Sequence, residues 1–438
     1  MKSILNFLIE ANKLKDMPRT GWGLMKIENP EKISEHIFRV VISAWLLGEL
    51  KNLNAKKLIE LTLCHDLCEV YAGDMTPFFY WDGLKREKED EEKILLRGVR
   101  LSQKEKEKRG KIKFIKEKKS LLKLLSLLEA DLKGEIYSSW LNYEKRISKE
   151  GKFVKQIDRI ETLLQSIEYF GPEKVNSGTS WWEGTEEVVE DPLLLDFLEV
   201  VQKKFYRKTL KIGFHKKKIS GIPPLRKKQL ENILDFLVIL GKLKRISRRG
   251  WVLRGVKNPE TIASHIFNLA LMSWVLSRKY KNLNPEKLLK MAFCHAIPKI
   301  ILGDSTPYDK ILRAKTEEEK REILKKWIRF SRKEKAVSFL GEYKREKKAI
   351  RKLTRSLGAK MKKEIFQLWE EFKLMKTPEG YFLNQIDVVA TVLQALRYWQ
   401  KDKRFPIGGF WEWAFEACDD SVQLKFLEEL KIKYGENS

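Results

Sequence analysis

The chain has 438 residues, which is enough for two domains that each bury a core without disulfide bridges. No apolar run is long enough to span a bilayer, and the first residues enter an amphipathic pattern instead of a secretory signal, so we expect a cytoplasmic protein without a membrane partner. The formal net charge of +27 would attract nucleotides or nucleic acid. However, the lysines alternate with glutamates along the expected helices, which favours solvated helix faces over nucleic-acid binding.

Two collinear copies of one pattern make up almost the whole chain, about 229 residues apart. Trp22 corresponds to Trp251, and residues 29–31 correspond to residues 258–260. This period is far longer than that of a solenoid repeat, so each copy is expected to form a complete domain. The sequence predicts a first domain over residues 1–208, a basic linker over 209–226 and a second domain over 227–438.

The apolar residues of both copies follow helical spacing, and no segment shows strand alternation with hairpin chemistry. Asn29 followed by Pro30 predicts the start of one helix. Asn54 predicts the start of a second helix, which passes through residue 65 and stops at Gly73. Later helices are expected along the charged stretch that begins at residue 84, over residues 121–146 and over residues 153–169. The sequence therefore predicts two all-α domains.

Histidine is scarce, and four of the five histidines stand at matching positions in the two copies. In the first copy His36 precedes the pair His65 and Asp66, Glu69 follows closely, and Asp158 lies far downstream. Imidazole and carboxylate groups are the usual ligands of a catalytic divalent cation, so this placement predicts a metal site. His65, Asp66 and Glu69 are expected around one helix surface, whereas the other two residues must come from other helices. A structural alternative stays open, because single buried histidines and carboxylates more often belong to the core.

Two imidazoles and two carboxylates would leave coordination positions open for water and substrate, as in a catalytic metal site. A bound cation lowers the pKa of its water, and Glu69 beside the ligands would carry a proton to a leaving oxygen. Hydrolysis of a phosphoester fits these parts.

The second copy has lost part of this chemistry. Ala296 replaces the aspartate that follows the second histidine, and Lys299 replaces the glutamate. Pro298 falls within the helix that presents His295 and is expected to kink it. The second copy keeps the other residues of the pattern, namely Arg248, Trp251, His265, Asp304 and Asp387. We expect a catalytically silent domain that packs on the first as a pseudo-dimer; the alternative is a domain that binds a nucleotide without cleaving it.

The first copy resembles the HD-domain metal-dependent phosphohydrolases, and among them the 5'-deoxynucleotidase branch. The resemblance covers most of residues 14–170, and the second copy looks like a degenerate duplicate. The segments that carry it are residues 18–22, 30–36, 65–69, 73–74 and 152–158.

The resemblance implies a divalent cation bound by His36, His65, Asp66 and Asp158, with Glu69 assisting the chemistry. The identity of the cation stays open among Mn, Co, Fe, Mg and Zn. It also implies that a nucleoside 5'-monophosphate is held by Arg19, Trp22, Asp74, Met75, Thr76 and Pro77.

The chemistry of these side chains agrees with such roles. The guanidinium of Arg19 suits a phosphate, Trp22 would form a wall beside the sugar or base, and Asp74 would accept from a sugar hydroxyl. Trp22 as a core residue at a helix junction and Asp74 as a turn residue after Gly73 remain alternatives.

We therefore expect a metal-dependent phosphomonoesterase that acts on 5'-deoxynucleoside monophosphates in its first domain only. One alternative is a phosphohydrolase of the same superfamily that acts on another nucleotide. The other is a non-catalytic scaffold that binds nucleotides or nucleic acid, with the positive charge as its main feature. The intact Asp66 and Glu69 argue against the scaffold.

Overall fold

The computed structural model of the chain describes residues 1–76, 102–175, 179–206 and 221–435. Within these ranges the regular elements are helices, and the extended pairings are two isolated bridges, Pro18 with Lys32 and Ser247 with Thr261. The predicted all-α fold is confirmed. None of the helices in these ranges is long and apolar enough to cross a membrane.

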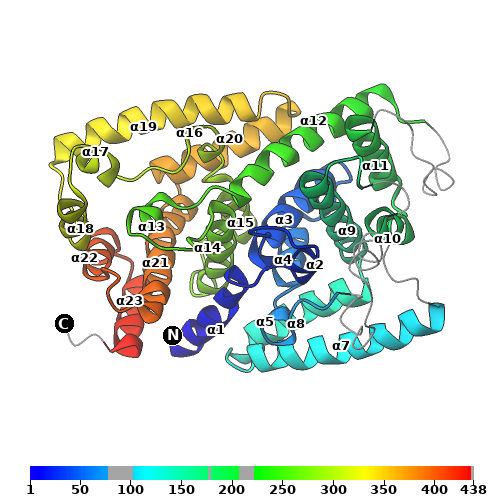
Figure 1. The fold of residues 1–438 in the computed structure, drawn as a ribbon, viewed down its shortest axis with the longest axis horizontal. Coiled ribbons are helices and arrows are strands. Elements are labelled where there is room, and N and C mark those ends of the chain that lie inside the picture. The colour runs from blue at the N-terminus through cyan, green and yellow to red at the C-terminus, as the bar shows by residue number, and fades with distance from the viewer. Residues whose placement is uncertain (77–101, 176–178, 207–220, 436–438) are drawn as a thin grey trace. The chain divides into compact units, whose positions relative to one another are not determined.

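The helices of the two copies follow one another in the same order (Figure 1). The first copy contains α1 (Lys2–Ala11), η1 (Asn12–Lys15), α2 (Thr20–Leu24), α3 (Ile33–Glu49), α4 (Ala55–Cys64), α5 (Glu69–Ala72), α7 (Gln103–Leu125), α8 (Ala130–Lys145), α9 (Lys149–Phe170), α10 (Ser180–Val188) and α11 (Pro192–Phe205). The second contains α12 (Pro224–Leu240), η4 (Gly241–Lys244), α13 (Arg249–Leu253), α14 (Ile262–Ser277), α15 (Pro285–Cys294), α16 (Lys299–Leu302), α17 (Tyr308–Leu312), α18 (Glu317–Lys325), α19 (Arg332–Leu353), α20 (Ala359–Leu374), α21 (Pro378–Lys401), α22 (Gly408–Ala417) and α23 (Ser421–Tyr434).

The chain divides into two compact units whose limits differ from those of the sequence copies. One unit contains residues 10–238, and the other contains residues 1–9 together with residues 239–438. The first helix of each copy, α1 or α12, therefore groups for most of its length with the body of the other copy. The domain boundaries predicted at residues 208 and 227, and the pseudo-dimer packing, stay predictions.

Polar contacts within each unit accompany this grouping. In the unit of residues 10–238, Lys204 of α11 pairs with Asp235 of α12 at 2.5 Å. In the other unit, Lys433 of α23 donates to Asn6 of α1 at 2.6 Å. Each exchanged helix thus makes a hydrogen bond or ion pair in the unit that it joins.

The core of the first unit is built around α3. Its residues 33–48 are all buried, because the helix is apolar on most sides and is covered by α4 and α9. Helix α8 packs on α4 and α9 in turn. In the other unit α14 is buried between α15 and α21, and α20 packs on both of them. In each unit, therefore, two helices cover a central buried helix, and a third helix packs on both of them.

The helix predicted to begin at Asn29 begins instead at Ile33. Asn29 has a φ of +51°, which asparagine tolerates better than most residues. Lys32 is extended, pairs with Pro18 in an isolated bridge and donates its N–H to Glu35 Oε2 at 2.7 Å. The bridge holds the chain extended beyond the predicted start, so the helix forms only after it.

The helix predicted from Asn54 to Gly73 is divided in two. Its start is confirmed, because the side chain of Asn54 accepts from the backbone N–H of Lys57 at 2.9 Å. Helix α4 then ends at Cys64, residues 65–68 form a turn, and the short α5 follows. Gly73 ends α5 with a φ of +75°, a conformation that favours glycine.

The turn between α4 and α5 recurs in the second copy between α15 and α16. The N–H of Glu69 donates to the carbonyl of Asp66 at 3.0 Å, and Lys299 donates to Ala296 at the same distance. These bonds to the third preceding residue tighten the chain in both copies. Pro298 therefore lies in a turn that also forms in the first copy, where there is no proline. The helix is interrupted here as expected, but the proline is not the cause.

The helix predicted over residues 121–146 is also two helices, because α7 ends at Leu125 and α8 begins at Ala130. The helix predicted over residues 153–169 is confirmed within α9. Between α8 and α9 the chain turns through Arg146, which has a φ of +53°. This tight connection sets the crossing of the two helices.

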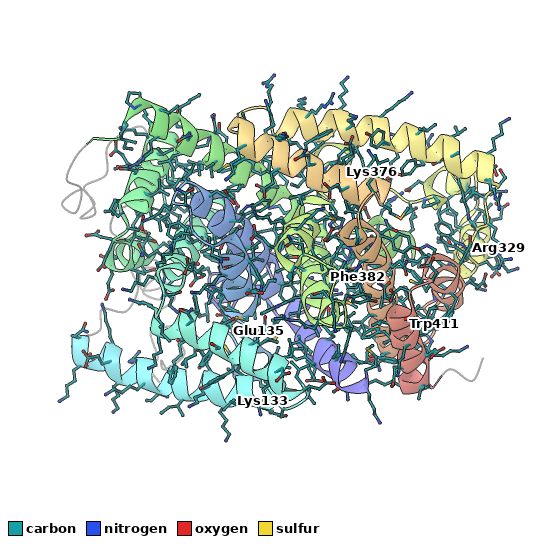
Figure 2. The ribbon with its side chains drawn as sticks, turned by 180° about the vertical axis from the view of Figure 1, so that it is seen from behind. Lys133, Glu135, Arg329, Lys376, Phe382 and Trp411 are labelled. Atoms are coloured by element: carbon teal, nitrogen blue, oxygen red, sulfur yellow. The ribbon has the colours of Figure 1, made fainter. Side chains whose placement is uncertain are left out.

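Lysines on exposed helix faces pair with carboxylates about one turn away. On α18, Lys320 pairs with Glu317 at 2.7 Å, and Lys325 pairs with Glu322. Figure 2 shows long side chains that extend away from α7 and α19 along their length. These pairs support the expectation that much of the positive charge lies on solvated helix faces.

We predict that Gly151→Ala lowers the free energy of unfolding by about 1–3 kcal/mol. A Cβ at Gly151 would lie 2.6 Å from the backbone oxygen of Asn142, so α8 and α9 would have to move apart. Gly134→Ala in α8 is the matched control, because its Cβ would meet nothing within 4 Å and alanine favours a helix. Thermal and urea unfolding of the full chain would measure both variants. Equal stabilities of the two variants would contradict the close approach.

Candidate metal centre

The structure brings the four predicted ligands together from three parts of the first unit. His36 lies on α3, His65 and Asp66 lie in the turn after α4, and Asp158 lies on α9. His36, His65 and Asp66 each offer a ligand atom within 4.8 Å of the others. His36 Nε2 lies 3.0 Å from Asp158 Oδ1, and His65 Nε2 lies 3.1 Å from Asp66 Oδ2. Packing of α3, α4 and α9 therefore assembles the cluster.

The two imidazoles present the same nitrogen to the cluster. His36 Nδ1 lies 2.5 Å from Glu161 Oε2, and His65 Nδ1 lies 2.6 Å from the carbonyl oxygen of Thr62. Both Nδ1 atoms thus face acceptors, which leaves Nε2 toward the carboxylates. His65 Nε2 is buried and makes no hydrogen bond within the described part of the chain. An orphaned buried acceptor beside carboxylate oxygens fits a divalent cation.

A buried ion network lies behind His36. Glu161 Oε1 accepts from Arg39 Nε at 2.8 Å, and the guanidinium also donates to Glu168 at 2.6 Å and to Gln165 at 2.9 Å. Arg39 and Glu161 have fully buried side chains. None of these residues was predicted. Their signal in the sequence is a set of polar residues on α9 at the helical spacing of Asp158.

Tyr143 of α8 is a further neighbour that the sequence did not predict. Its hydroxyl donates to Asp158 Oδ2 at 2.8 Å, and its ring centre lies 5.0 Å from that of His65. Phe372 has the corresponding place in the second copy, at 5.0 Å from His295, and has no hydroxyl to donate. Tyr143 therefore holds the Asp158 carboxylate by a bond that the second copy lacks.

The surrounding charges set the protonation of the cluster. Burial disfavours the charged form of His36, but Glu161 and Asp158 outweigh it and raise its pKa to about 9. Burial also opposes ionisation of Asp158, yet the bond from His36 holds its pKa well below the usual value. Burial, with repulsion from Asp66 and Asp74, raises the pKa of Glu69 well above the usual value. The buried Glu69 carboxyl therefore holds a proton more tightly than a solvated glutamate does, whereas Asp158 is stabilised in its ionised form.

Arg19 and Asp74 lie beside the cluster. Arg19 Nη1 is 3.2 Å from Asp66 Oδ2, and its Nε is 3.7 Å from Asp74 Oδ2. Asp74 Oδ2 also accepts from the backbone N–H of Thr20 at 2.7 Å, at the start of α2. Asp74 thus has a structural contact that explains its place, and the substrate contacts predicted for both residues stay predictions.

Trp22 is nearly enclosed, with 3% of its surface exposed. Its Nε1 donates to Glu31 Oε1 at 2.9 Å, and its ring packs against Tyr169 with 5.3 Å between centres. Trp251 of the second copy repeats the bond with Glu260 at 2.9 Å. This arrangement matches the alternative of a core tryptophan, and a contact with substrate stays a prediction.

The rest of the predicted substrate segment is only partly described. Met75 is buried, and Thr76 has a buried hydroxyl without a hydrogen-bond partner within the described ranges. Pro77 lies outside the described residues.

The second copy brings together His265, His295 and Asp387, each with a ligand atom within 4.8 Å of the others. His265 Nε2 lies 2.7 Å from Asp387 Oδ1. Lys299 pairs with Asp304 at 2.6 Å, so its charge is compensated within the unit. The retained residues of the pattern therefore form a cluster without the second carboxylate.

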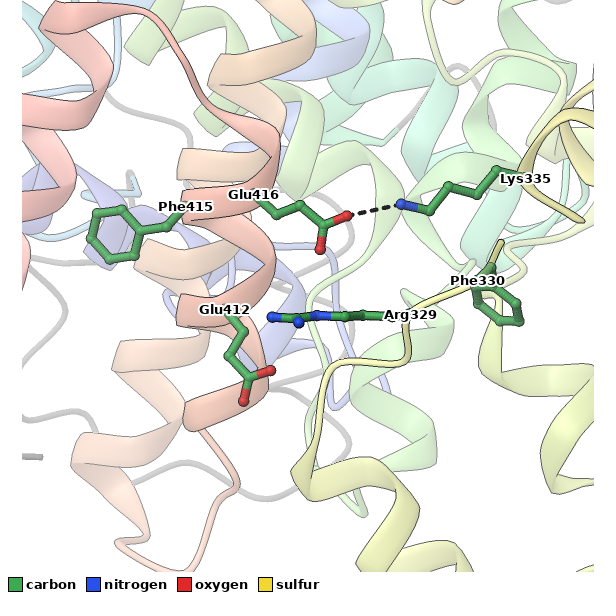
Figure 3. A pocket seen from close by; sticks show the side chains of 6 residues that line it. All are labelled: Arg329, Phe330, Lys335, Glu412, Phe415 and Glu416. Atoms are coloured by element: carbon green, nitrogen blue, oxygen red, sulfur yellow. Dashed lines mark hydrogen bonds and ion pairs between the residues drawn. The ribbon is translucent and has the colours of Figure 1, made fainter. Parts of the chain in front are cut away.

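A surface pocket of about 650 Å³ lies elsewhere in the second copy, between α22 and the segment before α19 (Figure 3). Lys335 pairs there with Glu416 at 2.8 Å, and Arg329 reaches between the acidic side chains of Glu412 and Glu416. None of the predicted site residues lines this pocket. The clustered histidines remain the candidate site.

A family model for the HD domain matches residues 11–188, 240–347 and 334–408. The chain therefore belongs to the HD-domain family, and the resemblance seen in the sequence is confirmed. The match in both copies agrees with a tandem duplication.

Relatives of the first part of the chain carry the name 5'-deoxynucleotidase. The protein HDDC2 of Xenopus laevis is 35% identical over 173 residues, which cover 40% of this chain and 72% of that protein. The human HDDC2 is 32% identical, and the match covers 38% of this chain and 69% of that protein. The protein hdd1 of Schizosaccharomyces pombe is 30% identical, and the match covers 46% of this chain and 90% of that protein. Among solved structures, a predicted metal-dependent phosphohydrolase from Magnetospirillum magnetotacticum matches 47% of this chain and 86% of its own, at 21% identity and a TM-score of 0.30.

A divalent cation that binds at His36 must displace the proton held there, so we predict that its apparent affinity rises between pH 6.5 and about 9. The increase is expected to be about tenfold per pH unit, because one proton leaves for each cation. Calorimetric titration with Mn²⁺ at about pH 7.5, in two buffers of different ionisation enthalpy, should show about one proton released. An affinity that is constant over this range would contradict the prediction.

Proposed function

We propose that the chain is a metal-dependent phosphomonoesterase that releases phosphate from 5'-deoxynucleoside monophosphates, with its chemistry in the first copy. The observation that carries the proposal is the convergence of two imidazoles and two carboxylates beside the buried Glu69, in a chain of the HD-domain family. The relatives that are named 5'-deoxynucleotidases support the substrate class.

The converging residues would hold the cation, namely His36, His65, Asp66 and Asp158. When bound, a divalent cation would polarise the phosphate and lower the pKa of the attacking water. The mixed imidazole and carboxylate set suits several cations, among them Mn, Co, Fe, Mg and Zn. Tyr143 keeps the Asp158 carboxylate turned toward the cluster through its hydroxyl.

Glu69 would supply the proton for the leaving group. Its raised pKa keeps a proton on the buried carboxyl, which can donate it to the 5'-oxygen of the nucleoside as the bond to phosphorus breaks. Arg19, next to Asp66, would contact the phosphate through its guanidinium. The nucleoside would lie toward Trp22 and the segment of residues 74–77.

The second copy lacks the groups for this chemistry. Ala296 offers no ligand, and Lys299 stands where the proton donor would be and pairs with Asp304. We therefore assign no hydrolysis to the second copy.

Glu69→Gln is expected to lower kcat by about 100-fold to 10,000-fold, because the amide keeps the shape of the side chain and cannot donate its proton in the same way. Lys299→Gln, at the corresponding position of the second copy, is the matched control and should leave kcat unchanged. Phosphate release from 5'-deoxynucleoside and ribonucleoside monophosphates with Mn²⁺ would measure both, with bound metal determined in parallel. Full turnover by the Glu69 variant, or equal losses in the two variants, would overturn the assignment.

Arg19→Ala is expected to raise KM by about tenfold to 100-fold, because a charge-assisted hydrogen bond to phosphate contributes about 1.5–3 kcal/mol. Steady-state kinetics with one deoxynucleoside monophosphate would separate this effect from a change in kcat, and the unfolding temperature would report any loss of structure. If KM and kcat both match the wild type, Arg19 does not contact the substrate.

A further inference from the structure

The two copies keep the same pair of histidines but differ in the residues behind the first one. We propose that Glu161 is the positioning residue that makes His36 a metal ligand, and that the loss of its counterpart closes the second copy to divalent cations. This inference rests on the metal site of the proposed function.

In the first copy the hydrogen bonds fix which nitrogen of His36 faces the cluster. A carboxylate only accepts hydrogen bonds, so at 2.5 Å from Glu161 Oε2 the Nδ1 atom must be the donor. When a cation displaces the second ring proton, the lone pair is therefore left on Nε2, 3.0 Å from Asp158 and 3.9 Å from Asp66. His36 is fully buried, so solvent provides no competing partner.

Glu161 is itself held in place by a second donor. Its Oε1 accepts from Arg39 Nε at 2.8 Å while its Oε2 faces His36, so both oxygens are engaged. Arg39 is anchored in turn by Gln165 and Glu168, one and two turns farther along α9. A carboxylate satisfies both donors at once, whereas an amide offers one acceptor oxygen. The ring orientation is therefore set before a cation arrives.

The second copy has lost the charged groups of this network and keeps only the glutamine, as Gln394. Counting 229 residues onward, Ala390 replaces Glu161, Asn268 replaces Arg39, and Arg397 replaces Glu168. No carboxylate thus stands on α21 to accept from His265 Nδ1 in the way that Glu161 accepts from His36.

Arg248 approaches His265 Nδ1 instead, with its Nη1 at 3.0 Å. A guanidinium only donates hydrogen bonds, so Nδ1 of His265 must be the acceptor. The proton of the neutral ring then lies on Nε2, which is 2.7 Å from Asp387 Oδ1. A cation could bind this Nε2 only if the proton moved to Nδ1, and there the Arg248 guanidinium already donates.

The loss of the Asp66 carboxylate in the second copy accounts for the place of this guanidinium. In the first copy Arg19 lies 3.2 Å from Asp66, whose counterpart is Ala296. Without that partner, Arg248 bonds to Glu260 at 3.2 Å and to Thr391 at 3.1 Å, beside the imidazole. The positive charge of Arg248 thus lies beside His265 in the second cluster. It follows that an aspartate at position 296 alone would not restore a metal site, and that a glutamate at position 390 is needed as well.

The test is calorimetric titration of the metal-free full chain with Mn²⁺. The wild type should bind one cation, and Glu161→Ala should weaken binding by about tenfold to 100-fold. Glu161→Gln, which keeps the volume and so guards against unfolding by a buried cavity, should weaken it by about tenfold because its NH2 group would face one of the two donors. Ala390→Ser, at the corresponding position, is the control and should leave the affinity unchanged.

Variants of the second copy test the inference independently, in the same titration. Ala296→Asp should still bind one cation, whereas Ala296→Asp with Ala390→Glu should bind two. In the metal-free chain labelled with ¹⁵N-histidine, long-range proton–nitrogen correlations should show the proton of His265 on Nε2.

The outcomes separate this inference from the proposed function. If His65→Ala leaves Mn²⁺ binding intact, the metal site of the proposed function is wrong. If His65→Ala abolishes binding but both Glu161 variants bind like the wild type, Glu161 is not a positioning residue. The inference that the second copy binds no divalent cation would be wrong if the wild type bound two cations and His295→Ala lost one of them. It would also be wrong if the proton of His265 lay on Nδ1.

Discussion

One buried ion pair, between Arg39 of α3 and Glu161 of α9, underlies the arrangement of the site. Removing either partner would leave an isolated charge in the core, at a cost of about 3–5 kcal/mol. The pair links the two helices in the first unit, whereas α14 packs on α21 in the other unit with Asn268 and Ala390 at these positions. It also gives His36 an acceptor on the side away from the cluster. The helix packing therefore does not require the pair, and its particular contribution is the orientation of the ligand.

The two copies separate what the fold needs from what the chemistry needs. In both, a buried tryptophan donates a hydrogen bond to a glutamate at 2.9 Å. The backbone N–H of that glutamate donates to a tyrosine hydroxyl at 2.8 Å. The glycines at which α9 and α21 approach the preceding helix are also kept. By contrast, Ala296, Lys299 and Ala390 differ in charge or polarity from their counterparts. The packing contacts have therefore been retained on one scaffold while the residues of the candidate site have changed.

The fold class and the histidine cluster were predictable because the sequence carries a long internal repeat and few histidines. The turn at residues 65–68, Tyr143 and Glu161 were not, because their places depend on neighbours far away in the chain. Glu161, for example, meets His36 across 125 positions. The start predicted at Asn29 failed for a similar reason, since a bridge to Pro18 overrides the local capping signal. Local patterns determined the helices, and tertiary contacts determined their ends and the second layer of the site.

The grouping of residues 1–9 with residues 239–438 has a consequence for biosynthesis. Helix α1 is synthesised more than 200 residues before the body that it groups with. The apolar residues Ile4, Leu5, Phe7 and Leu8 are buried in the finished protein, so their burial is completed only after that body has been made. Until then the nascent chain carries an apolar helix that is prone to premature association.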